Sequence, residues 1–326
     1  MTGDRAADGA TGSEPVSVNL VTARRDRVLD AMAGAGIDVL VLGRQDNAAY
    51  ACGMRRLWTA GTRPFGAGCI VVGSTGRVHA LSSWDDGVEP PMGFDDLYPL
   101  TWNPRVMAAS MAAIDGLAGA GRIGVDELTP SFGRAAAHFA PEAEVVVADD
   151  LVAAVRRHKL PGEIEAITRA CRAAWVGVEA ALDAPRRTDP AGVAIKALAG
   201  RGVTVPSSGI RAERRGVGLS IDIGMICDIY EGGVGGVFVD GRRAGLATLV
   251  DACRAGATHA DLARAATSND WMVRGLGMGF ELPVIGLQIG TGERIEAGMV
   301  LSVIDGGRRD VVHVTAGGPV VLSARP

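Results

Sequence analysis

Cysteines are few in this sequence and follow no recognisable spacing. The chain of 326 residues has five of them, an odd number, and none forms a CxxC pair. This pattern excludes a disulfide framework and a zinc-knuckle site, and it is typical of proteins kept in a reducing compartment. We therefore expect a cytoplasmic protein.

Long apolar runs and an excess of charge are also lacking. No apolar run reaches the ~18 residues that a membrane span needs, and the first residues lack the apolar core of a secretory signal. The net charge is −4 and the pI is about 5.8, which gives no basic surface for nucleic acid. We expect neither a membrane nor a nucleic-acid partner, and residues 1–18 predict a disordered tail.

Helical and strand patterns alternate through the first half of the chain. Helices are predicted from Leu20 to about residue 34, over 103–117 and over 130–139. Strands are predicted over 37–42, 122–125 and 144–147, and a hairpin joins 67–72 to 78–81. This alternation predicts an α/β domain over residues 19–157.

A long amphipathic helix over 162–182 opens the second half. Apolar residues from Ile164 to Leu182 step by three or four and form one stripe. Prolines at 185 and 190 end the helix. We place the second domain at 158–326.

The order of these segments resembles the creatinase, prolidase and aminopeptidase P family. The likeness runs from about Leu20 to Leu182, and SSWDDG at 82–87 is similar to the creatinase branch. Three later stretches follow the family's order: LSIDIG at 219–224, GLGMGFELP at 275–283, and GMVLSVIDG at 298–306 with DVVHVT at 310–315. The resemblance implies an α/β N-terminal domain followed by an α+β pita-bread domain, here reduced in size, in a dimeric protein.

The residues that hold two metal ions in this family are mostly replaced. The resemblance places the first ligand at Asp222, which is kept. The other four positions fall at Gly233, Leu276, Ile304 and Arg309. Two divalent cations need bridging carboxylates, and an arginine repels them. We therefore expect no metal and no other cofactor, and we exclude a metallopeptidase. The histidine that creatinase uses is missing as well, because no histidine lies between 158 and 259.

Strand alternation predicts what faces the former metal cavity. Residues i and i+2 of a strand point the same way, so Glu231 shares a face with Gly233 and His313 shares one with Arg309. The predicted catalytic set is Asp222, Glu231, Arg309 and His313. An imidazole beside a carboxylate suits acid–base chemistry near neutrality, and an arginine suits a carboxylate or an oxyanion. The alternative is that Arg309 only neutralises the acids and His313 is an ordinary half-buried residue.

A second group of residues is predicted to bind substrate. Arg55, Arg56 and Trp58 follow the YxxG turn at 50–53, and the resemblance implies that this loop reaches a substrate pocket, often in the partner subunit. A solvent-facing basic loop is the alternative. Asp305 is a further candidate, although alternation points it to the other face.

Two classes of function follow. One is a metal-independent enzyme that performs cyclisation, isomerisation, elimination or hydrolysis on a small molecule, as in specialised metabolism. The other is a non-catalytic pseudo-peptidase that binds a small molecule or a protein. Retention of Asp222 beside three other polar residues favours the enzyme.

Overall fold

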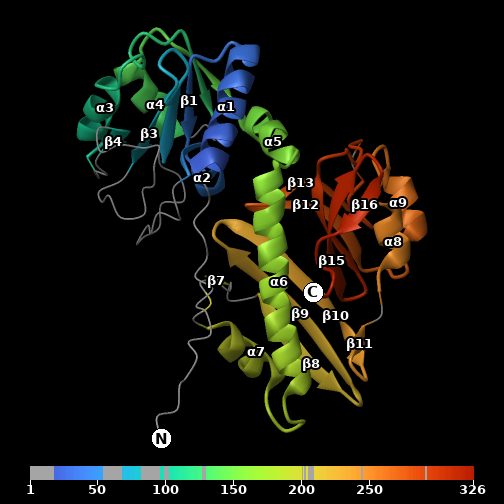
Figure 1. The fold of residues 1–326 in the computed structure, drawn as a ribbon. Helices are drawn as coiled ribbons and strands as arrows, with labels where there is room; N and C mark the ends of the chain where they lie inside the picture. The colour runs from blue at the N-terminus through green and yellow to red at the C-terminus, as the bar shows by residue number, and fades with distance from the viewer. Residues whose placement is uncertain are drawn as a thin grey trace, which may run out of the picture. The chain divides into compact units, whose positions relative to one another are not determined.

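The computed structural model describes residues 18–53, 68–81, 96–98, 103–126, 130–199, 201, 203–204, 209–243, 245–290 and 292–326. The chain forms two compact units, one over Val16–His158 and one that begins at Lys159. Each unit has its own sheet (Figure 1). No helix in the described ranges is long and apolar enough to cross a membrane.

The N-terminal unit is built on a mixed six-stranded sheet of order β4-β3-β2-β1-β5-β6. Its strands are β1 (Val39–Leu42), β2 (Cys69–Val72), β3 (Arg77–Leu81), β4 (Leu97–Tyr98), β5 (Arg122–Val125) and β6 (Glu144–Val147). β1 runs parallel to β5 and antiparallel to β2. The predicted hairpin is confirmed, with Cys69 opposite Ala80 and Val72 opposite Arg77.

Helices cover both faces of this sheet. They are α1 (Val18–Ala35), α2 (Gln45–Cys52), α3 (Pro104–Ala112), α4 (Pro130–Phe139) and α5 (Asp149–Arg157). Alternate strand residues such as Val39 and Ile123 pack against α3 and α4, while α1 lies on the opposite side (Figure 1). α3 ends five residues earlier than predicted, because the chain turns before Gly116, which has a φ of 83°.

The C-terminal unit is built on a curved antiparallel sheet. The strands are β7 (Val203–Thr204), β8 (Ile210–Arg215), β9 (Gly218–Cys227), β10 (Tyr230–Val239), β11 (Arg242–Arg243), β12 (Trp271–Gly277), β13 (Gly279–Gly286), β14 (Val300–Asp305), β15 (Arg308–Thr315) and β16 (Gly318–Val321). The main path runs β13-β12-β14-β15-β10-β9-β7. The helices are α6 (Pro161–Asp183), α7 (Pro190–Leu198), α8 (Ala247–Ala252) and α9 (His259–Ala265).

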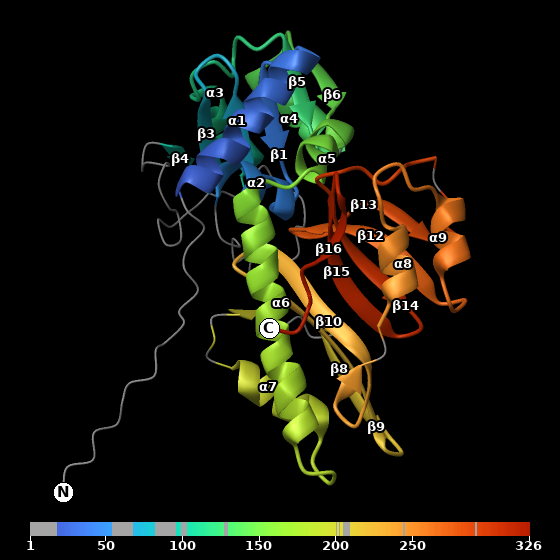
Figure 2. The same cartoon turned by 45° about the vertical axis from the view of Figure 1, so that its right-hand side comes forward.

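This sheet has two halves, each with its own hydrophobic core. One core joins α6 and α7 to Ile221, Ile223 and Val234 of β9 and β10. The other joins α8 and α9 to residues such as Val273 and Val312. α6 lies along β9 and β10, while α8 contacts β14 and β16 and α9 contacts β13 (Figure 2). The halves meet where β10 pairs with β15, at Gly235 opposite Arg309. The two-domain α/β plus pita-bread architecture predicted from the sequence is confirmed.

Candidate functional site

Alternation along β9 and β10 separates a packed face from a polar face. Ile221, Ile223 and Val234 point into the core under α6. Asp222 and Glu231 therefore point to the other face. Asp222 is opposite Gly235 in the strand register, and Glu231 is opposite Ile226. The polar side of the sheet thus carries two carboxylates on adjacent strands, at the junction of its halves.

Arg309 reaches this face from β15. Its Nε donates to Oδ1 of Asp222 at 2.8 Å, and its Nη2 lies 2.6 Å from the same oxygen. Nη1 lies 3.9 Å from Oε1 of Glu231. The Arg309 side chain is 11% exposed, whereas that of Asp222 is 40% exposed. The guanidinium is therefore largely buried between two acids, and Asp222 forms the accessible edge.

A second arginine, Arg274 of β12, completes the group. Its Nη2 donates to Oε1 of Glu231 at 2.5 Å, and its side chain is 9% exposed. Sequence reasoning missed Arg274, although a signal was present. Arg274 stands two residues before Leu276, a former ligand position, and alternation puts both on one face. Two carboxylates and two guanidiniums make the cluster, which we call the Arg309 network, electrically neutral.

Three glycines make room for the Arg309 side chain. A Cβ at Gly224 would lie 3.0 Å from Nη2 of Arg309, and a Cβ at Gly233 would lie 3.0 Å from its Cζ. At Gly235 a Cβ would come within 2.6 Å of Oδ1 of Asp222. The guanidinium thus lies over positions where side chains would otherwise project, including the position of the family's second aspartate.

Divalent cations do not fit the Arg309 network. The guanidinium already binds the one retained ligand, Asp222, and its fixed charge repels metal ions. A Cβ at Gly233 would also lie 2.6 Å from the carbonyl oxygen of Ile223, so that position has no room for a ligand side chain without a backbone shift. Within the described ranges, no three His, Cys, Asp or Glu side chains are grouped so that they could hold a metal.

His313 does not join the Arg309 network. It shares strand β15 with Arg309, but the two residues are four positions apart, which is about 13 Å along a strand. In the described part of the chain, no carboxylate lies within ion-pair distance of its ring. Burial lowers the pKa of His313, so the imidazole is neutral near pH 7. This placement agrees with the alternative hypothesis, in which His313 is an ordinary half-buried strand residue.

Asp305 is a buried residue that stabilises a turn. It is 1% exposed and accepts hydrogen bonds from the backbone and hydroxyl of Thr267 and from Ser268. Burial alone would raise the pKa of Asp305, but these hydrogen bonds outweigh it and hold the pKa below the usual value. The carboxylate thus fixes the turn before β12 and is not placed to meet a ligand, contrary to the sequence-based expectation.

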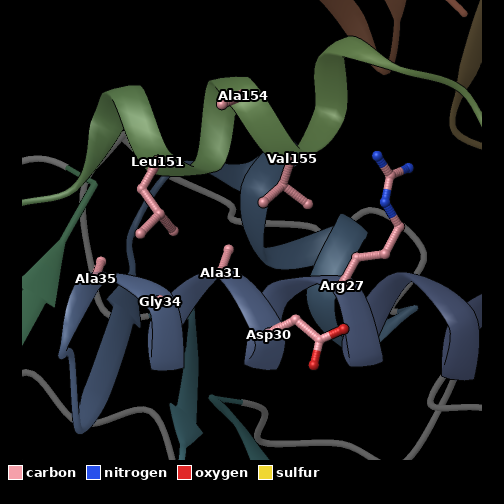
Figure 3. A pocket seen from close by; sticks show the side chains of 8 residues that line it. All are labelled: Arg27, Asp30, Ala31, Gly34, Ala35, Leu151, Ala154 and Val155. Atoms are coloured by element: carbon pink, nitrogen blue, oxygen red, sulfur yellow. The ribbon is translucent and has the colours of Figure 1, made fainter.

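The remaining predicted residues, Arg55, Arg56 and Trp58, lie outside the described ranges. In the N-terminal unit, an open groove lies between α1 and α5 (Figure 3). Leu151 and Val155 point from α5 toward α1, and Arg27 at the rim donates to the carbonyl of His158 at 2.7 Å. The groove is mainly apolar and holds no pair of catalytic groups.

No cysteine near the network is a ready nucleophile. Cys171 of α6 lies behind β10, and it is fully buried. Burial raises the pKa of the Cys171 thiol to about 12, so the thiolate is scarce at neutral pH. Ser302 of β14 faces the same side as Arg274, its register partner, but it is fully buried. Neither side chain is accessible to a substrate.

Comparisons with known proteins show which proteins share this architecture. Residues 24–158 match the Creatinase/Prolidase N-terminal domain. No curated protein matches the chain. Among solved structures, a prolidase from Pyrococcus horikoshii is similar over 93% of this chain and 99% of its own, with a TM-score of 0.67 and 16% identity.

Two further structures show the same likeness. A Xaa-Pro dipeptidase from Bacillus anthracis has a TM-score of 0.66 at 17% identity and covers 94% of this chain and 98% of its own. An X-Pro aminopeptidase from Thermotoga maritima has a TM-score of 0.66 at 16% identity and covers 91% and 98%. The N-terminal unit therefore matches the Creatinase/Prolidase N-terminal domain, and the chain as a whole has the two-domain fold of these prolidases and aminopeptidases.

Proposed function

We propose that this protein acts by binding, as a metal-free pseudo-peptidase on a prolidase fold. The observation that carries the proposal is the ion pair, 2.6 Å long, between Arg309 at a replaced ligand position and Asp222 at the ligand position that is kept. Truncating one partner of such a pair leaves the other charge unpaired, so the two side chains depend on each other. Arg309 thus supplies the positive charge that balances Asp222 without a metal ion.

The position of His313, outside the Arg309 network, favours binding over catalysis. His313 is the residue whose ordinary pKa suits this work, and it lies about 13 Å along the strand from Arg309. Both carboxylates of the Arg309 network are held by guanidiniums.

The accessible edge of the network indicates how a ligand would attach. Arg309 occupies Oδ1 of Asp222, and the other carboxylate oxygen remains available at the 40% exposed side chain. Arg211 stands opposite Asp222 in the register of β8 and β9, and it is exposed. A small molecule with a hydrogen-bond donor for Asp222 and an acidic group for Arg211 would fit this edge.

A metal-independent enzyme is the second candidate, and the exposure of Asp222 favours it. An accessible carboxylate beside a fixed guanidinium can accept a proton while the guanidinium stabilises a developing anion. Cyclisation, isomerisation, elimination and hydrolysis of a small molecule are all compatible with such a pair. A role in specialised metabolism would follow if neighbouring genes encoded a biosynthetic route.

We further propose a cytoplasmic homodimer, in which Arg55, Arg56 and Trp58 reach the partner's cavity. Sedimentation at micromolar concentration tests this assembly. A dimer is expected, and a monomer would remove the role of these residues in recognition.

The decisive experiment compares hydrolysis with binding. Purified protein is assayed with Xaa-Pro dipeptides in the presence of Mn²⁺ or Co²⁺, and a library of small acids, amines and amino acids is screened by thermal shift. We expect no hydrolysis and at least one stabilising ligand that is recovered unchanged after incubation. Conversion of the ligand would instead support the enzyme, and metal-dependent dipeptide hydrolysis would refute both candidates.

A matched pair of variants locates the ligand. Asp222→Asn removes the accessible charge and should abolish the thermal shift. Asp251→Asn changes an exposed carboxylate on α8, on the other half of the sheet, and should leave the shift intact. Equal shifts in both variants would show that the ligand binds elsewhere.

A further inference from the structure

Arg309 holds a central position in the second unit. Its backbone makes the pairing of β15 with β10, opposite Gly235, and its side chain extends to Asp222 on the next strand. Both the backbone and the side chain therefore connect the two halves of the sheet.

The surroundings of the guanidinium are those of a bound cation. Asp222 Oδ1 contacts two of its nitrogens, at 2.8 and 2.6 Å, and Oε1 of Glu231 lies 3.9 Å from the third. Gly224 and Gly233 contribute no side chains, and a Cβ at either position would lie 3.0 Å from an atom of the guanidinium. The guanidinium thus fills the space between Asp222, Glu231 and these two glycines, while Glu231 also binds Arg274.

We infer that the guanidinium of Arg309 acts as the bound cation of this site. When the Arg309 side chain is removed, the recess that it leaves binds a free guanidinium ion. This inference goes beyond the proposed binding role and does not depend on it. Arg309→Ala leaves Asp222 without its counter-ion and opens the recess to solvent. A free guanidinium ion offers the same planar donors without the connecting chain.

The test is chemical rescue of stability. The Tm of Arg309→Ala is measured in low-millimolar guanidinium chloride and in sodium chloride of the same ionic strength. A ligand that binds only the folded state raises Tm, and we expect a rise of about 2–4 °C for a unit of this size when the recess is mostly filled. The wild type should show no rise, because its own side chain fills the recess.

Two controls separate specific binding from a general salt effect. Val311→Ala destabilises the same strand by truncating a buried side chain but opens no cation recess, so guanidinium should not raise its Tm. Asp222→Asn combined with Arg309→Ala removes the main anionic contact and should lose the rescue. No rise in Arg309→Ala, or an equal rise in either control, would overturn the inference.

A charge cycle covers the case in which Arg309→Ala does not fold. Adding Asp222→Asn to Arg309→Ala removes the unpaired acid, while Glu231 keeps its partner Arg274, and should restore a folded protein. Asp222→Asn in the wild type should destabilise it, because it leaves Arg309 without its main partner. If the double variant also fails to fold, Arg309 is required for a reason other than charge, and the inference is overturned.

Discussion

Gly233 lacks a Cβ, and this leaves room for the guanidinium of Arg309. A Cβ there would lie 2.6 Å from the carbonyl oxygen of Ile223 and 3.0 Å from Cζ of Arg309. The first contact involves backbone, which cannot rotate away. The glycine therefore allows the close approach of β9 and provides the surface on which the guanidinium rests.

Gly233→Ala should consequently destabilise the protein by about 1–3 kcal/mol, the usual cost of overpacking a well-packed site. Denaturant titration measures the change. Gly290→Ala is the control, because a Cβ at Gly290 meets nothing within 4 Å. A loss of stability equal to that of the control would contradict the steric argument.

His313 predicts a particular dependence of stability on pH. Burial lowers its pKa, so the folded state binds a proton less readily than the unfolded chain does. The stabilisation is therefore complete above the unfolded pKa of about 6.5 and is lost as the pH falls through that value toward the lower, folded pKa. His313→Gln should flatten the stability curve between about pH 7 and 5. An unchanged slope in the variant would show that other groups cause the acid sensitivity.

Alternation of side chains explains both what the sequence predicted at the site and what it did not. It assigns Glu231 and Arg309 to the face of Asp222, and the structure brings these three together. It assigns His313 to the same face. Alternation predicts which way a side chain points but not how far along the strand it lies from the other residues of the site. Alternation also assigns Arg274 to the face of Leu276, but the pairing of Arg274 with Glu231, 43 residues away in sequence, became apparent only in the folded sheet.

At the scale of elements, Asp126 organises the start of α2. Its carboxylate, on a residue that is 1% exposed, accepts hydrogen bonds from the backbone of Gly43 and Arg44 and from the side chain of Asn47, at 2.7, 2.9 and 3.0 Å. The acid follows β5 and the amides follow β1, its parallel neighbour. Asp126 thus joins the ends of two strands to the first turn of a helix.

Asp126→Ala should cost about 1–3 kcal/mol, because it leaves buried N–H groups unpaired. Hydrogen exchange measured by mass spectrometry should show faster exchange over residues 43–52. Asp150→Ala removes an exposed acid from α5 and should leave this segment protected. Equal exchange in the two variants would contradict the role of Asp126.

The elements themselves could largely be predicted from the sequence. The strands at 122–125 and 144–147 and the helix at 130–139 have the predicted bounds. α2 and α5 were not predicted as separate helices. Each is eight or nine residues long, and the side chain of Arg156 in α5 binds Asp46 and Asn47 in α2. Short helices of this kind depend on tertiary contacts more than on their own periodicity.

At the scale of the whole molecule, the Arg309 network predicts independence from metals. Protein purified without chelators should contain well under one metal ion per chain by elemental analysis. EDTA should leave Tm unchanged, since metal binding contributes nothing to folding here. A Tm lowered by EDTA and restored by Mn²⁺ would contradict the assignment of Arg309 as the counter-ion.

The close packing of the backbone beneath Arg309 also bears on how a metal site could be rebuilt in this chain. A side chain at Gly233 meets the Ile223 carbonyl while β9 and β10 keep their present spacing, and loss of Arg309 alone leaves Asp222 without its counter-ion. Either single change therefore lowers stability before it restores a set of metal ligands. Rebuilding a metal site here would require several substitutions at once, together with a shift of the β9 and β10 backbone.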